Sequence, residues 1–157
     1  MLLEVRESHA AGDGDLAVVP VLLSIAKSTR ALNMVFLSEI GLSPGQDRLL
    51  DALDPIQPLS SVIVAAETDV KPSTVSKMTD RLERDGYVVR VASNLDSRLT
   101  LLALTPAGVR MQKQIRKVWR RMEEELAKGM PQGEFSEFAK GLVHACDLLR
   151  RQMKQPR

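Results

Sequence analysis

Residues 71–86 read Lys71-Pro-Ser-Thr-Val-Ser-Lys-Met-Thr-Asp-Arg-Leu-Glu-Arg-Asp-Gly86 and set the class of fold. Val75, Met78 and Leu82 recur at the spacing of one face of a helix. The remaining arc carries hydroxyl and cationic side chains, at Ser73, Thr74, Ser76, Lys77, Arg81 and Arg84. This pattern predicts a helix that packs through one face and presents donors and positive charge on the other, as a helix in a DNA major groove does.

The residues after this helix predict a β-hairpin. Residues 87–92 are rich in β-branched side chains and read as a strand, residues 93–97 as a polar tip, and residues 99–104 as the return strand. Gly86 suits the end of the preceding helix, because glycine readily adopts the left-handed conformation found there.

The segment before the helix predicts the first half of a helix-turn-helix. Ser60 or Ser61 can cap a short helix at residues 62–67, and residues 68–70 form a connection of the required length. The side chains expected to pack this short helix are Val62, Ile63 and Ala66. With the hairpin, this arrangement predicts a winged helix-turn-helix.

Two more helices are expected before the winged region. The first runs from near Val19 to Gly41, with a broad apolar surface. The second has Ser43 as a candidate N-cap and Pro44 at its first position, and it ends before Pro55. The side chains expected to point inward from the second helix are Leu49, Leu50 and Leu53.

Two long helices are expected after the hairpin. Thr105 caps the first, which starts at Pro106 and ends near Lys128, and residues 134–154 form the second. The fold class is therefore mainly α with a small β-hairpin wing. The expected organisation is an N-terminal arm and dimerisation helix (1–42), a winged helix-turn-helix DNA-binding region (43–104) and C-terminal dimerisation helices (105–157), with a second copy covering the apolar faces of the long helices.

Composition favours helix packing and a cytoplasmic protein. The 157 residues are 44% hydrophobic but only 3% aromatic, which indicates an aliphatic core. The single cysteine excludes an intramolecular disulfide, and no stretch approaches the roughly 18 apolar residues of a membrane span. The net charge of +2 is too small to diagnose nucleic-acid binding by itself. We expect a cytoplasmic location, at the nucleoid when DNA is bound, and no membrane partner.

Three motifs resemble the MarR family, the multiple antibiotic resistance regulators. They are the run from Thr74 to Val88, then Asp96-Ser97-Arg98, then Leu104-Thr105-Pro106-Ala107-Gly108. The family's wing signature is an Asp, any residue and an Arg, followed by a Leu-Thr, and the chain carries it at the family's spacing. The resemblance implies a homodimeric transcription regulator, a repressor, that binds a pseudo-palindromic double-stranded DNA operator. It also implies release by a small aromatic or phenolic effector, for which no residue here identifies a site.

Five side chains of the helix at 72–86 are candidates for DNA contact. Ser73, Thr74 and Ser76 lie in its first turns, where the partial positive charge of a helix N-terminus favours phosphates. Lys77 and Arg81 lie one turn apart, and each can contact a phosphate or a base edge.

The wing adds three candidates. By the resemblance, Arg98 enters the minor groove, where the concentrated negative potential attracts a guanidinium. Asp96 is expected to hold Arg98 extended through a charge-assisted hydrogen bond. Arg90, in the middle of a strand, either touches phosphate or is a solvated strand charge.

Other conspicuous residues have simpler interpretations. The basic run at 110–121 is expected to be a solvated or intersubunit ion-pair face, with Arg110 or Lys113 as possible support for the DNA surface. Trp119 is expected to be a packing anchor and Cys146 a buried, inert thiol. No His, Cys or carboxylate spacing indicates a metal site.

Two other functions remain open from the sequence. One is a thiol-based oxidant sensor acting through Cys146, and the other is a winged helix that binds proteins without binding DNA. No phosphate-binding glycine loop or nucleophile elbow is present, so we expect no enzyme and no cofactor.

Overall fold

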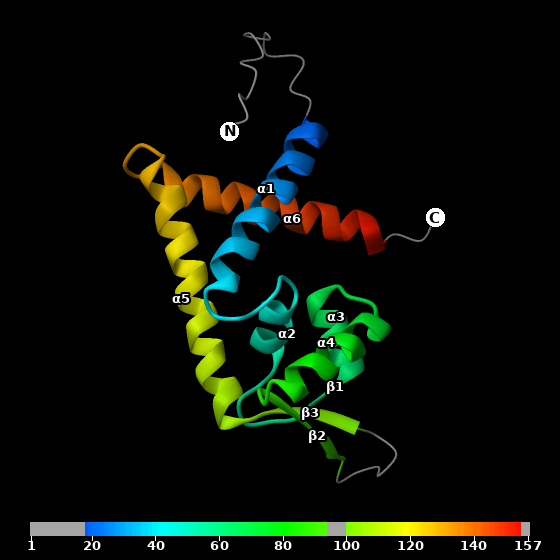
Figure 1. Ribbon diagram of the computed structural model, residues 1–157. Helices are drawn as coiled ribbons and strands as arrows, with labels where there is room; N and C mark the ends of the chain where they lie inside the picture. Colours follow the sequence, from blue (N-terminus) through cyan, green and yellow to red (C-terminus); the bar gives the residue numbers. More distant parts are fainter. Residues whose placement is uncertain (1–17, 94–99, 155–157) are drawn as a thin grey trace.

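The computed structural model describes residues 18–93 and 100–154, which form six helices and one small sheet (Figure 1). The helices are α1 (Val18–Ser38), α2 (Gln46–Ala52), α3 (Ser61–Thr68), α4 (Pro72–Arg84), α5 (Pro106–Lys128) and α6 (Glu134–Lys154). The strands β1 (Leu59–Ser60), β2 (Val88–Ala92) and β3 (Thr100–Leu104) form an antiparallel sheet in the order β1-β3-β2. This architecture confirms the predicted fold class.

The core lies where α2, α3, α4, the sheet and the first half of α5 meet. Its fully or nearly buried side chains include Leu49, Leu50, Val64, Val75, Leu82, Val88, Leu102 and Ile115. Helices α2, α3 and α4 and strands β1 to β3 form the winged region (residues 43–104), which lies at one end of the molecule in Figure 1. Helix α5 runs from the winged region toward α1 and α6, which we call the terminal helices (Figure 1).

Thr105 and Gly108 join the wing to α5. The Thr105 hydroxyl accepts a hydrogen bond from the Gly108 backbone N–H at 3.0 Å and donates one to the Gly86 carbonyl at 2.7 Å. A Cβ on Gly108 would lie 2.1 Å from the Tyr87 carbonyl oxygen, so only glycine allows this close approach. The predicted cap at Thr105 is confirmed, and α5 is fixed directly onto the end of α4.

The predicted start of α2 is wrong. The helix begins at Gln46 rather than Pro44, and its N-cap is Gly45, at φ 102°. The Ser43 N–H donates to the Gln46 side chain at 2.9 Å, and the Gly45 N–H donates to the Asp47 carboxylate at 2.7 Å. These bonds close a turn ahead of the helix, and a Ser-Pro pair suits such a turn as well as a cap.

The predicted packing face of α3 is also wrong. Val62 and Ile63 are 67% and 46% exposed, whereas Val64 and Ala65 are buried against the core. Helix α3 contacts both α2 and α4, so the side chains between those two helices are covered. Ala66 is exposed as well, and an eight-residue helix that is apolar on most sides gives little periodicity from which to choose a face.

The sheet has a third strand that the sequence did not predict. Leu59 pairs with Leu102, and Ser60 pairs with Leu101. Ser60 then caps α3 by accepting a hydrogen bond from the Ile63 N–H at 3.3 Å, as expected for one of the two candidate caps. A two-residue strand is too short to show an alternating pattern.

The terminal helices expose much of their apolar surface. Exposed side chains include Val19, Val21, Leu23 and Val35 on α1, and Val143, Leu148, Leu149 and Met153 on α6. By length and composition alone, α1 would qualify as a membrane-spanning helix, with a mean hydropathy of 1.2 in its most apolar window. This finding corrects the expectation that no stretch approaches such a span.

Cys146 is exposed, so the prediction of a buried thiol is wrong for the single chain. The cause is the position of α6, which makes few contacts with the rest of the chain. None of the described side chains of α6 is buried.

Candidate nucleic-acid interface

Helix α4 is anchored by one face, as its sequence predicts. Val75, Thr79 and Leu82 are buried, and Met78 is half-buried against the core. Pro72 occupies the first turn, and Lys71 at the N-cap makes no side-chain capping bond. The helix is therefore held by packing, with its first turn toward solvent.

The exposed face of α4 brings the five predicted contact residues together. Ser73, Thr74, Ser76, Lys77 and Arg81 are all exposed. Within residues 18–93 and 100–154, no carboxylate lies within ion-pair distance of Lys77 or Arg81. These two cations are therefore available to anionic partners.

The turn before α2 lies beside this face, which the sequence did not indicate. A shallow cavity of about 220 Å³ is lined by Ser43, Pro44, Gln46, Thr74, Lys77, Met78 and Arg81. The α1–α2 turn thus borders the cationic part of α4.

The wing is formed by β2 and β3, whose register pairs Val88 with Leu104 and Ala92 with Thr100. Asp96 and Arg98, at the predicted tip, lie outside the described residues. Their predicted roles remain predictions.

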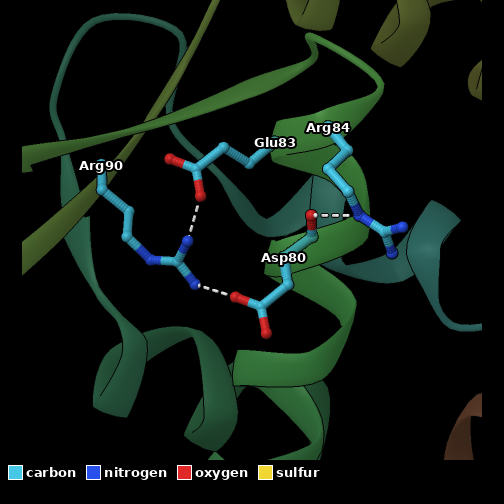
Figure 2. Close-up of polar contacts among 4 residues, drawn as sticks. All are labelled: Asp80, Glu83, Arg84 and Arg90. Carbon is cyan, nitrogen blue, oxygen red and sulfur yellow. Dashed lines mark hydrogen bonds and ion pairs between the residues drawn. The ribbon is translucent and has the colours of Figure 1, made fainter.

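Arg90 lies in the middle of β2 and is bound to α4 (Figure 2). Its Nη2 contacts the Asp80 carboxylate at 2.5 Å, and its Nη1 contacts the Glu83 carboxylate. The hydrogen bond that Arg90 donates to Asp80 is the main reason that the pKa of Arg90 lies above its usual value. Arg84, on the other side of Asp80, donates from Nε to the Asp80 backbone carbonyl at 3.3 Å (Figure 2).

A buried carboxylate joins three helices behind α4. Asp47 is 1% exposed and accepts hydrogen bonds from Asn33 Nδ2 of α1 at 2.9 Å and from Trp119 Nε1 of α5 at 3.3 Å. Trp119 packs against the core, which confirms its predicted role as a packing anchor. Asp47 was not among the predicted residues, although an acidic residue just before the buried leucines of α2 is a signal for such a link.

A larger cavity of about 620 Å³ lies between α1, α2 and the start of α4. Its lining is largely apolar, with two guanidinium groups from Arg30 and Arg48. Asn33, Asp47, Thr74 and Met78 also line it, so the cavity touches the buried carboxylate and α4 together.

Part of the basic run on α5 is engaged within the chain. Arg116 contacts Asp51 of α2 at 2.8 Å, and Arg121 contacts Glu39 at 2.7 Å and lies over the Phe36 ring. The run is therefore partly an intrachain ion-pair face rather than only a solvated or intersubunit one. In the described part of the chain, no cluster of His, Cys, Asp and Glu could hold a metal ion.

Comparisons with known proteins agree with this geometry. The family profile described as "Iron dependent repressor, N-terminal DNA binding domain" matches residues 51–93, from the end of α2 through β2. The HTH-type transcriptional repressor MdtR of Bacillus subtilis is 35% identical over 68 residues, which cover 43% of this chain and 44% of MdtR.

Two solved structures match nearly the whole fold. The structure of Streptococcus pneumoniae FabT in complex with DNA gives a TM-score of 0.71 at 25% identity, over 86% of this chain and 96% of FabT. Wild-type apo MarR from E. coli gives 0.73 at 20% identity, over 83% of this chain and 98% of MarR. The chain therefore has the winged-helix fold of these two proteins.

The matched regions cover only part of the candidate site. Residues 51–93 include the five α4 candidates and Arg90 but end before Asp96 and Arg98. The alignments to the curated relatives span 44% to 57% of those proteins' lengths.

Proposed function

We propose that this protein is a DNA-binding transcriptional repressor of the MarR family that binds a pseudo-palindromic duplex as a homodimer. The observation that carries the proposal is the division of α4 into a packed face and an exposed face. The exposed face carries two cations, Lys77 and Arg81, that have no carboxylate partner among residues 18–93 and 100–154. The solved FabT complex with DNA has the same fold and supports the proposal.

Each part of the exposed face has a chemical role in this proposal. Lys77 and Arg81 bind phosphates or guanine edges, and an Arg paired with guanine contributes about 1–3 kcal/mol of discrimination. The hydroxyls of Ser73, Thr74 and Ser76 donate to phosphate oxygens or base edges. Two α4 helices enter successive major grooves about one helical turn apart.

The homodimer is supported by the apolar surface of the terminal helices. Soluble monomers rarely expose large contiguous apolar patches, and α1 and α6 both expose many large aliphatic side chains. A second copy related by a twofold axis would cover them and would set the spacing of the two α4 helices.

Fluorescence anisotropy with a labelled duplex, selected by the protein from a random-sequence library, tests the proposal. We expect Lys77→Ala with Arg81→Ala to weaken binding about 100-fold, because two charged contacts are lost at about 1.4 kcal/mol each. The control is Lys117→Ala with Arg120→Ala, which removes the same charge from an exposed face of α5. Arg98→Ala should also weaken binding if the wing enters the minor groove.

Salt separates DNA binding from the alternative of a protein-binding winged helix. We expect the logarithm of the association constant to fall steeply with the logarithm of salt concentration, and the α4 double variant to reduce that slope by about 2. Absence of salt-dependent duplex binding by the wild-type protein would favour the alternative.

We further propose that a small aromatic or phenolic effector binds in the 620 Å³ cavity and releases DNA. The cavity's apolar lining suits an aromatic ring, and Arg30 and Arg48 suit an anionic substituent. Trp119, the single tryptophan, is linked to the cavity through Asp47, so benzoate or phenol bound there should change its emission. An effector screen that changes neither Trp119 emission nor duplex affinity would remove this part of the proposal.

A further inference from the structure

We propose that Arg90 is a positioning residue that neutralises the two carboxylates of α4 and holds the wing against that helix, rather than a residue that contacts DNA. The inference rests on the proposed DNA-binding function and assigns a role to a side chain that the sequence left between two interpretations.

The contacts leave the ends of the guanidinium occupied. Nη2 binds Asp80 and Nη1 binds Glu83, and both carboxylates come from successive turns of α4 (Figure 2). The remaining N–H groups of the guanidinium lie beside two carboxylates, whose negative charge disfavours the approach of a phosphate. A guanidinium that binds two carboxylates together is more firmly oriented than one in an ordinary surface ion pair.

The charges of α4 explain how this contact could affect DNA binding. Asp80 and Glu83 are the acidic side chains of a helix whose cations are Lys77, Arg81 and Arg84. Asp80 is adjacent to Arg81, so an uncompensated carboxylate there would lie beside a proposed phosphate contact and repel DNA. Arg90 cancels that repulsion from the side of the wing, and the pKa of Arg90 is raised by the same partners.

The position of Arg90 also fixes the wing. It is the central residue of β2 and is paired with Leu102 of β3. Only residues 85–87 separate β2 from the end of α4. An ion pair from the middle of the strand to α4 therefore limits the angle between the wing and the recognition helix.

A thermodynamic cycle on duplex binding tests the role. The four proteins are the wild type, Arg90→Met, Asp80→Asn with Glu83→Gln, and the triple variant, each measured by anisotropy with the duplex described above. Methionine retains the aliphatic stem of Arg90, so the packing of the strand is largely preserved. If Arg90 acts through the carboxylates, Arg90→Met should weaken binding about 10-fold in the wild-type background but less than about 2-fold when both carboxylates are neutral.

Equal weakening in the two backgrounds would show a direct DNA contact and would overturn the inference, as would no weakening in the wild type. Arg116→Ala is the matched control, because it removes one cation from an exposed ion pair on α5 and should leave affinity unchanged.

Hydrogen exchange supplies a readout without DNA: amides of residues 88–92 should exchange faster in Arg90→Met than in the wild type or in Arg116→Ala. If the wild type binds no duplex, the proposed function fails. Unchanged exchange in Arg90→Met would separately overturn the role of Arg90 in holding the wing against α4.

Discussion

The winged region and the terminal helices both have amphipathic sequences, but they differ in how far one protomer buries their apolar side chains. In the winged region the apolar side chains of α2, α4 and the sheet are covered by other parts of the chain, and Leu49, Leu50, Val75 and Leu82 are fully buried. On α6 none of the described side chains is buried. One protomer therefore completes the core of its own winged region but leaves α6 and much of the apolar surface of α1 uncovered.

This difference predicts that substitutions in the two regions affect different equilibria, the folding of each protomer and the association of protomers. Substitutions in the winged region should act on the folding of each protomer, because their contacts are intrachain. Substitutions on the terminal helices should act on association, since their exposed apolar side chains gain contacts only from a second protein surface. The same substitution placed in each region should therefore give different results.

The largest contrast is expected between two glycines, one at the start of α5 where it joins the winged region and one in α6. In Gly108→Ala the new methyl group would lie 2.1 Å from the Tyr87 carbonyl oxygen, and we expect a loss of about 4 kcal/mol in the free energy of unfolding. Gly141→Ala, in the middle of α6, meets no atom within 4 Å in the protomer and should stabilise the helix by about 0.8 kcal/mol. Urea denaturation of both variants measures the difference. Destabilisation by Gly141→Ala would mean that a partner packs tightly at that position.

A second contrast concerns exposed aliphatic side chains. Val21 on α1 and Leu149 on α6 are each 51% exposed, and we expect Val21→Asp with Leu149→Asp to weaken self-association by about 3 kcal/mol, or more than 100-fold. The circular dichroism of the variant should remain that of a folded protein. Val62→Asp, on an exposed α3 side chain, is the control and should leave self-association unchanged in sedimentation equilibrium. Equal effects of the two changes would place the association surface on the winged region instead.

The sequence predicts this molecule best where one local signal determines one element. Thr105 and Pro106 place the start of α5 correctly, and the helical spacing of Val75, Met78 and Leu82 gives the packed face of α4. These signals depend on neighbours within one turn of the chain, so they hold whatever the tertiary structure is.

Prediction fails where distant segments decide the outcome. The buried face of α3 depends on two flanking helices, and the exposure of Cys146 depends on α6 lying away from its own core. For the site, the sequence identifies the exposed side chains of α4, but it cannot show that Arg90 reaches Asp80 and Glu83, because that contact joins a strand to a helix.

Gln112 is a buried polar residue that the sequence analysis missed, although it shares the apolar face of α5 with Gly108 and Ile115. Its Nε2 donates to the carbonyls of Leu50 at 2.7 Å and Leu53 at 2.8 Å, at the end of α2, where the Leu50 carbonyl also accepts from the Leu53 N–H at 3.3 Å. We expect Gln112→Leu to lower the free energy of unfolding by about 2 kcal/mol, because the carbonyls of Leu50 and Leu53 both lose the hydrogen bond from the Gln112 amide, while the leucine gains apolar contacts.

The matched control for this prediction is Gln114→Leu, on an exposed position of the same helix, which should change stability by less than about 0.5 kcal/mol. Denaturant unfolding measures both variants, and self-association should be the same in both because Gln112 lies within the protomer's own core. If Gln112→Leu were as stable as Gln114→Leu, the hydrogen bonds from α5 to the end of α2 would not contribute to the stability of the protomer. The view that each protomer completes its winged region through intrachain contacts would then be wrong at the junction where α5 joins it.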